Sequence, residues 1–209
     1  MTAPRPLTQK LAELRATLRS RSPQVLAHHT GAVYRQSDDG KGELRLSLWG
    51  QEVGVAFPAL IVETSPGVEA REDVQALLLY HLLTADDTPL AGDWIGFSAL
   101  PNAAFYQQAY QGYTGASLAQ AFGEDEQAFA NAALQLGGIP VAFADRAYAF
   151  SVLPRFALLV ACWRGDEDFP ASYKVLLDAS ASHQLPTDVC AIVGGMLAGR
   201  LMKAKPLRT

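Results

Sequence analysis

Apolar residues recur along this chain at two different spacings, and the places where the spacing changes limit the folds that it can adopt. Residues 6–20 carry leucines three and four positions apart, which is typical of an amphipathic helix. Residues 32–63 and 146–177 carry short alternating or continuous apolar runs, which predict β-strands. The region between them has helical spacing, as does 187–203. Separate blocks of helix and strand predict an α+β fold.

The first group of expected strands is an antiparallel meander with one buried face. Leu44, Leu46 and Leu48 occupy alternate positions, so they share one side of a strand. Turn-forming residues at 37–42 separate this strand from the one before it. Pro58 then interrupts the pattern, and we expect 59–63 to be an edge strand or a loop.

The second group of expected strands spans residues 146–152, 156–163 and 173–177. Its middle member, FALLVAC (Phe156–Cys162), is apolar without alternation, which indicates a strand covered on both faces. We expect both groups to form one mixed, mainly antiparallel sheet that packs against several helices. Because no repeat or long linker divides the chain, we predict a single α+β domain over residues 1–209.

Two of the expected helices carry residues that invite a functional interpretation. The helix at 69–84, opened by Ser65-Pro66-Gly67, is apolar on nearly all sides and contains His81. That histidine is either a hydrogen-bonded core residue or a general base or ligand. A helix capped by Ser98 runs through Gln111. Its aromatic residues either belong to the core or line a flat cofactor pocket: Phe105, Tyr106, Tyr110 and, just beyond it, Tyr113.

Composition and the length of the apolar runs argue against two classes of partner. The chain has 17 Lys and Arg against 21 Asp and Glu, a net charge of -4, which argues against a nucleic-acid partner. No apolar run approaches the ~20 residues that a membrane-spanning helix needs, and the N-terminus has no apolar core of signal-peptide length. We therefore predict a cytoplasmic protein with no membrane partner.

Sequence motifs for common chemistries are missing. There is no GxxxxGK[ST] phosphate loop, no GxSxG nucleophile motif and no HExxH zinc motif. The two cysteines, Cys162 and Cys190, each lie inside an apolar run and have neither disulfide nor metal-site spacing. We expect both to be buried, and we predict no metal site.

The densest polar chemistry lies between Trp163 and Asp188. An acidic loop, Asp166–Asp168, follows Trp163, and Asp178 and His183 come shortly after it. Carboxylates with one histidine can coordinate a hard cation or orient an imidazole for acid–base catalysis. Ordinary turn and helix-cap chemistry accounts for part of the same pattern.

At these residues the chain resembles an uncharacterised bacterial and archaeal family, the domain-of-unknown-function 3786 family. The resemblance rests on DVQALLLYHLLTADDTPLAGDWIGFSALP (Asp73–Pro101) and LPRFALLVACWRGDEDFPASYKVLLDASASHQLPTD (Leu153–Asp188). It implies an association with corrinoid or iron–sulfur methyl-transfer systems, and some members carry an added cysteine-rich domain. This chain departs there, because its two distant cysteines do not supply a four-thiolate cluster. No cofactor is therefore identified.

Three functions remain open. The first is a non-catalytic accessory protein that binds a small molecule or cofactor between the sheet and the helices carrying Tyr80, His81 and Phe105–Tyr113. Its candidate ligand-binding residues are His81, Tyr106, Trp163, Asp166, Glu167 and Asp168. The second is an enzyme that uses Asp178, His183 and the acidic loop, with or without a divalent cation. The third is a homo-oligomeric scaffold that associates through small residues of the last helix: Gly194, Gly195, Ala198 and Gly199.

Overall fold

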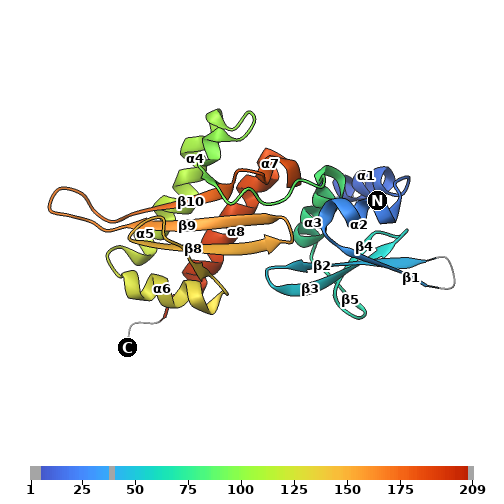
Figure 1. Ribbon diagram of the computed structural model, residues 1–209, viewed down its shortest axis with the longest axis horizontal. Helices are drawn as coiled ribbons and strands as arrows, with labels where there is room; N and C mark the ends of the chain where they lie inside the picture. Colours follow the sequence, from blue (N-terminus) through green and yellow to red (C-terminus); the bar gives the residue numbers. More distant parts are fainter. Residues whose placement is uncertain (1–5, 38–40, 207–209) are drawn as a thin grey trace. The chain divides into compact units, whose positions relative to one another are not determined.

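A computed structural model describes residues 6–37 and 41–206, and within them the chain forms two compact units (Figure 1). The first unit takes in the described chain up to Pro89, together with Val152–Arg155 and His183–Pro186. The second takes in Leu90–Ser151, Phe156–Ser182 and the described chain from Thr187 onward. The α+β class is confirmed. The single domain over residues 1–209 stays a prediction, which one calorimetric unfolding transition would support.

The sheet of the first unit is an antiparallel meander, as predicted. Its strands follow one another in the order β1 (Val33–Gln36), β2 (Gly42–Leu48), β3 (Gln51–Phe57), β4 (Ile61–Ser65) and β5 (Val68–Glu69). Leu44, Leu46 and Leu48 are all buried, which confirms the expected apolar face. Residues 38–40 of the expected turn lie outside the described residues.

Two expectations near β4 are wrong. β4 is an inner strand, paired with β3 and β5, and not an edge strand or loop. Pro58 does not weaken the strand because it lies in the turn before it. Likewise Ser65-Pro66-Gly67 does not open a helix. Gly67 has a positive φ of 76° and lies in the tight turn between β4 and β5.

The helices of the first unit are α1 (Pro6–Leu18), α2 (Pro23–Thr30) and α3 (Glu72–Thr84). The side chain of Ser22 caps α2 by accepting a hydrogen bond from the backbone N–H of Val25. α1 packs on α3, and α2 contacts both α3 and β1. The helices therefore cover the apolar face that the alternating leucines create (Figure 1).

The second unit contains its own antiparallel sheet, in the order β6-β10-β9-β8-β7. The strands are β6 (Trp94–Ile95), β7 (Ile139–Pro140), β8 (Arg146–Leu153), β9 (Phe156–Trp163) and β10 (Ser172–Asp178). The expectation of one common sheet is wrong. The spacing of apolar residues identifies the longer strands but carries no information about which distant strand each one pairs with. As predicted, every residue from Phe156 to Cys162 is buried.

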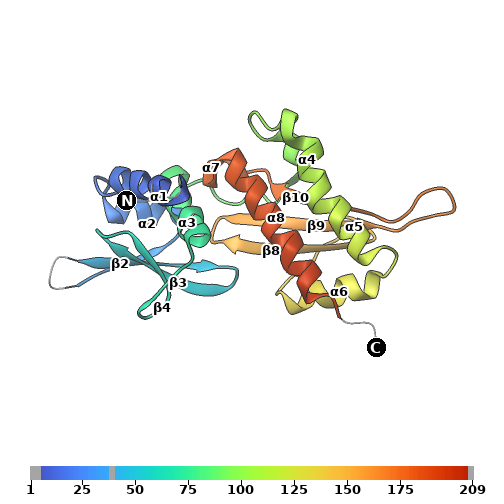
Figure 2. The same cartoon turned by 180° about the vertical axis from the view of Figure 1, so that it is seen from behind.

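Helices cover one face of this second sheet. α8 (Thr187–Ala204) crosses that face (Figure 2), and α5 (Ser117–Phe122) and α6 (Glu126–Gln135) pack beside it. A shorter helix, α7 (Ala181–Gln184), follows β10. No helix in the described part of the chain is long and apolar enough to cross a membrane.

The helix expected from Ser98 to Gln111 is broken. Ser98 lies within a 3₁₀ turn, η1 (Phe97–Ala99), so it is not a cap. A second 3₁₀ turn, η2 (Ala104–Tyr106), leads into α4 (Gln107–Gln111). Pro101 and Asn102 separate the two turns. Proline lacks the N–H that a helix interior needs, and Asn102 has a positive φ of 59°.

Candidate functional site

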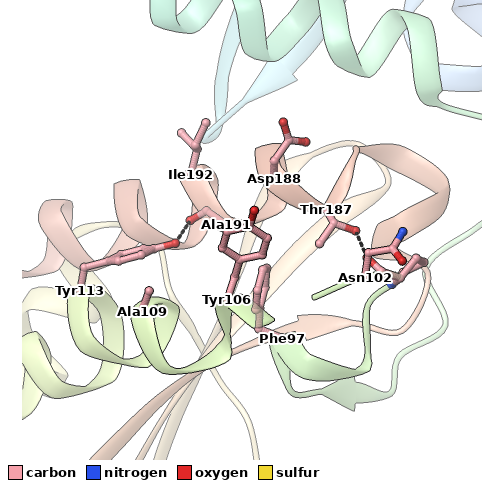
Figure 3. A pocket seen from close by; sticks show the side chains of 10 residues that line it. Phe97, Asn102, Tyr106, Ala109, Tyr113, Thr187, Asp188, Ala191 and Ile192 are labelled. Atoms are coloured by element: carbon pink, nitrogen blue, oxygen red, sulfur yellow. Dashed lines mark hydrogen bonds between the residues drawn. The ribbon is translucent and has the colours of Figure 1, made fainter. Parts of the chain in front are cut away.

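An open pocket of about 580 Å³ lies in the second unit (Figure 3). One wall comes from the chain before and within α4, and consists of Phe97, Pro101, Asn102, Tyr106, Ala109 and Tyr113. The other wall is the first turns of α8, with Thr187, Asp188, Ala191 and Ile192. Its volume falls within the ~300–1,000 Å³ of small-molecule sites, and its lining is mostly apolar.

Helical spacing aligns the side chains of both walls. Tyr106, Ala109 and Tyr113 are three and four positions apart, which places them on one side of successive turns. On α8, Ala191 follows Thr187 by four positions, or about one helical turn, and Ile192 follows Asp188 by the same interval. The pocket is therefore a groove between two helical faces.

The wall that carries the tyrosines rests on Tyr110, which is buried. The ring of Tyr110 stacks on Phe97 with centroids 4.3 Å apart and planes inclined by 14°. Its hydroxyl donates a 3.3 Å hydrogen bond to the carbonyl of Val175 in β10, and burial raises the pKa of Tyr110. On the α8 side, an added Cβ at Gly194 would come within 2.4 Å of this hydroxyl. Tyr110 is thus a core residue.

A π-helical turn, η3 (Gly112–Ala116), connects α4 to α5 and carries Tyr113. Gly115 lets this turn approach β10, because an added Cβ would come within 2.1 Å of the Tyr173 carbonyl oxygen. The hydroxyl of Tyr113 donates to the carbonyl of Ala191 at 3.5 Å (Figure 3). π-helical turns are rare and recur at functional sites.

Three polar side chains of the pocket are available to a ligand. The hydroxyl of Tyr106, the amide of Asn102 and the carboxylate of Asp188 make no hydrogen bond within the described residues. Thr187 is different, since its hydroxyl donates to the carbonyl of Pro101 at 2.9 Å. Tyr106 is also 66% exposed, which leaves its ring accessible.

The acidic loop forms its own turn. Oδ1 of Asp166 accepts hydrogen bonds from the backbone N–H groups of Asp168 and Phe169, at 2.9 and 2.8 Å. This is ordinary turn chemistry. Glu124 closes the base of the loop by accepting from the N–H of Gly165 and of Ala171. The carboxylates of the loop, including Glu167, line an open hollow of about 430 Å³ rather than the pocket.

The acidic loop and Asp178 lie at opposite ends of one strand. The loop precedes Ser172, the first residue of β10, and Asp178 is the last. A strand of 7 residues is about 20 Å long. The structure therefore does not bring these two candidates together (Figure 1).

Asp178 is 1% exposed and its carboxylate is saturated with hydrogen bonds. Oδ1 accepts from the N–H groups of Ala91 and Ser180, both at 2.9 Å, and from the Ser180 hydroxyl at 2.6 Å. Oδ2 accepts from the N–H of Gly92 at 2.8 Å. Burial opposes ionisation, but these bonds outweigh it and hold the pKa of Asp178 below its usual value. This arrangement anchors a loop.

His183 belongs to the first unit and has different partners. Its Nδ1 lies 2.8 Å from Oδ2 of Asp86 and 3.2 Å from the hydroxyl of Thr88. Hydrogen bonds from Thr88 and His183 lower the pKa of Asp86 to about 2. In a catalytic triad the acid and the nucleophile engage different ring nitrogens. Here both contacts fall on Nδ1, so Thr88 is not placed as a nucleophile.

His81 also lies in the first unit, on α3, and is fully buried. Its Nδ1 is 3.2 Å from the carbonyl oxygen of Gln184. Burial lowers the pKa of His81 to about 4, so the ring is neutral at neutral pH. These are the properties of a hydrogen-bonded core histidine.

Trp163 is the last residue of β9 and is half-buried. The Lys174 ammonium lies 5.5 Å from the centroid of its ring, and Phe143 packs edge-on at 6.3 Å. Neither contact involves the pocket. Among the candidate ligand-binding residues, Tyr106 is the one that lines the pocket between α4 and α8.

Two of the small residues of α8 face tyrosines of their own unit. Gly194 accommodates Tyr110, and an added Cβ at Gly195 would come within 3.2 Å of the Tyr113 ring. At Gly199 an added Cβ would meet nothing within 4 Å. The homo-oligomeric scaffold stays a prediction, which the mass of the protein in solution tests.

The side chains that commonly bind metals are dispersed over the described residues. No group of three or more His, Cys, Asp or Glu side chains there is arranged to hold a metal ion. Cys162 and Cys190 are buried and are not joined in a disulfide, and they lie in β9 and α8. Two such thiols do not fit an iron–sulfur cluster held by four thiolates.

The α8 wall of the pocket was missed from sequence, although one signal was present. The buried stripe of α8 contains Val189, Val193 and Leu197, at helical spacing. Ile192 falls outside that stripe and is 55% exposed. A single exposed apolar residue is common on protein surfaces, so Ile192 indicates a binding surface only together with Tyr106 and Tyr113 in the same pocket.

Comparison with known proteins identifies a family but no activity. The model of a protein family described as a domain of unknown function (DUF3786) matches residues 22–200. Comparison with curated proteins and with solved structures finds no match. The match spans both compact units and includes every residue of the pocket. The chain therefore belongs to the DUF3786 family.

Proposed function

We propose that this protein binds a small molecule in the pocket between α4 and α8 and acts as a non-catalytic accessory protein. The observation that carries the proposal is an apolar groove of about 580 Å³ with polar side chains free to orient a ligand. Such a combination is the usual form of a small-molecule site.

The exposure of the lining supports this proposal. Tyr106, Tyr113 and Ile192, which all line the pocket, are 66%, 44% and 55% exposed. When a ligand covers large apolar side chains that share one surface, their removal from water contributes favourably to the free energy of binding. Because Tyr110 and Phe97 are packed in the core, the groove is held open without a ligand.

The alternative enzyme would use Asp178 and His183, and the contacts of both argue against it. A buried carboxylate that accepts four hydrogen bonds has no free lone pair directed at a substrate. His183 is fixed to Asp86 through Nδ1 on an exposed surface, and it does not line the pocket between α4 and α8. We therefore favour binding over catalysis.

The proposal is tested by filling the groove. Ala109 is exposed and lines the pocket, so Ala109→Trp should occupy the space of a ligand and leave the fold intact. The probe is Nile red, a neutral apolar dye whose fluorescence rises in apolar surroundings. We expect the variant to bind the dye at least about tenfold more weakly than the unmodified protein.

A matched control lies in the next turns of the same helical segment. Ala116 is also exposed but does not line the pocket, so Ala116→Trp should bind Nile red as the unmodified protein does. Equal binding by Ala109→Trp and the unmodified protein would overturn the proposal, as would an equal loss in both variants. Native mass spectrometry of the purified protein then identifies a retained ligand.

A cytoplasmic location, without nucleic-acid or membrane partners, belongs to the same proposal. It rests on the net charge of -4 and on the apolar patterns of the sequence. Fractionation of cells that produce a tagged chain tests the location directly.

A further inference from the structure

We infer that the pocket between α4 and α8 selects an organic cation, with a flat apolar body and an amine or ammonium group held near Asp188. The inference rests on the proposed function, because it names the ligand class of the same pocket. It follows from the charge of the lining and from the aromatic faces that the lining presents.

The lining carries a negative charge and no positive one. Asp188 is its single ionisable acid or base apart from the two tyrosines, and no Lys, Arg or His lines the pocket within the described residues. The carboxylate is exposed and makes no hydrogen bond there. A cationic ligand would pair with it, whereas a carboxylate or phosphate would meet like charge without a basic partner.

The N-terminus of α8 opposes this preference but does not reverse it. Backbone N–H groups at a helix N-terminus attract anions, with the effect of about half an elementary charge. Asp188 lies in the first turn of the same helix and carries a full negative charge. The net charge from the helix N-terminus and the Asp188 carboxylate is therefore negative at this end of the pocket.

Aromatic rings on the facing wall favour the same ligand. Tyr106 and Tyr113 both line the pocket opposite the first turns of α8 (Figure 3). A cation within about 6 Å of a tyrosine ring is attracted to its face, and a flat apolar body can stack on it. The unpaired hydroxyl of Tyr106 can also accept a hydrogen bond from an ammonium group.

The test uses three probes that share one apolar body and differ in charge. They are 2-naphthylmethylamine, which is a cation at pH 7, 2-naphthalenemethanol, which is neutral, and 2-naphthoate, which is an anion. Isothermal titration calorimetry at low ionic strength measures their affinities for the full chain. We expect the cation to bind about tenfold more tightly than the anion, with the alcohol between them, and added salt to reduce that difference.

Asp188→Asn removes the charge without changing the size of the side chain. It should bring the affinity for the amine to that of the alcohol and leave the alcohol itself unchanged. Glu13→Gln is the matched control, because Glu13 is an exposed carboxylate on α1 and its loss changes the net charge equally. Tyr106→Leu is a second variant. In it the amine should bind more weakly than to the unmodified protein, but still more tightly than the anion, because Asp188 is retained.

The outcomes separate this inference from the proposed function. If the anion binds as tightly as the cation, or Asp188→Asn leaves the order of the three probes unchanged, the inference is overturned while Nile red binding still supports the pocket. If neither Nile red nor any naphthalene probe binds, both are overturned. The inference is supported if the cation binds more tightly than the alcohol and the alcohol more tightly than the anion, and if Asp188→Asn abolishes this order while Glu13→Gln preserves it.

Discussion

Asp178 and Gly92 are joined by a hydrogen bond of 2.8 Å, from the Gly92 backbone N–H to the Oδ2 atom of the carboxylate. The two residues are 86 positions apart in the sequence. This bond ties the loop that follows α3 to the end of β10, and the other oxygen of the carboxylate binds Ala91 and Ser180. The relationship gives Asp178 a structural role.

Asp178→Asn should therefore destabilise the fold without changing ligand binding. The new side chain has one acceptor oxygen, and its NH₂ group would face backbone donors in a buried site. We expect urea unfolding to show a loss of about 1–3 kcal/mol. Asp168→Asn, in the exposed acidic loop, should have almost no effect. A variant as stable as the unmodified protein that fails to bind Nile red would contradict the structural role.

His81 makes the stability of the fold depend on pH in a defined window. Burial lowers its pKa to about 4 from a usual value near 6.5. Between those values the unfolded chain takes up the proton and the folded chain does not, so stability falls as the pH is lowered from 6.5 to 4. The loss should be about 3 kcal/mol, measured by urea unfolding at a series of pH values.

His81→Gln should flatten the pH dependence in that window, because an amide can donate to the Gln184 carbonyl but does not titrate there. His28, whose ring is 68% exposed, is the comparison, and His28→Gln should preserve the slope. An unchanged slope in His81→Gln would assign the effect to another group. Below about pH 4 the carboxylates of Asp86 and Asp178 add a further loss, because their lowered pKa values mean that the folded chain resists protonation.

Gly194 and Gly199 on α8 should respond to alanine in opposite directions. At Gly194 an added Cβ would clash with Tyr110, which is buried and stacked on Phe97, and we expect a loss of about 1–3 kcal/mol. At Gly199 nothing lies within 4 Å, so alanine should stabilise the helix by up to about 1 kcal/mol. Thermal unfolding of the two variants measures the difference, and a shift of the same sign in both would contradict the packing of Tyr110.

Cys162 and Cys190 should be unreactive until the chain unfolds. Burial raises the pKa of both thiols, that of Cys190 to about 12, so little thiolate exists at neutral pH. Ellman's reagent should modify the folded protein very slowly and both thiols promptly in urea. Cys162→Ala and Cys190→Ala assign any reaction to one site, and rapid labelling of the folded chain would show that one thiol is accessible.

The sequence predicted most of the secondary structure because the relevant signals are local. The spacing of Leu44, Leu46 and Leu48 requires only that a strand place alternate side chains on one face. The unbroken apolar run Phe156–Cys162 indicated a doubly covered strand for a similar reason, and all of its residues are buried. Helix ends were predicted less well: Pro101 breaks the segment expected to be one helix, and Gly67 lies in a turn between strands instead of just before a helix.

The candidate site was harder to predict because its parts meet only in three dimensions. Tyr106, Tyr110 and Tyr113 look alike in sequence, yet Tyr110 is 2% exposed while its neighbours line the pocket. What separates them is contact with Gly194 on α8, which no local pattern reveals.

The sequence by itself determined the α+β class, the order of most elements and the family. Only the tertiary structure decided that the strands form two sheets and that Asp178 binds backbone amides rather than a ligand. It also decided that the segment around α4 and the first turns of α8 form the two walls of one pocket. The reason is physical: apolar spacing fixes which side of an element is buried, whereas the partner that buries it is chosen by packing between segments far apart in the chain.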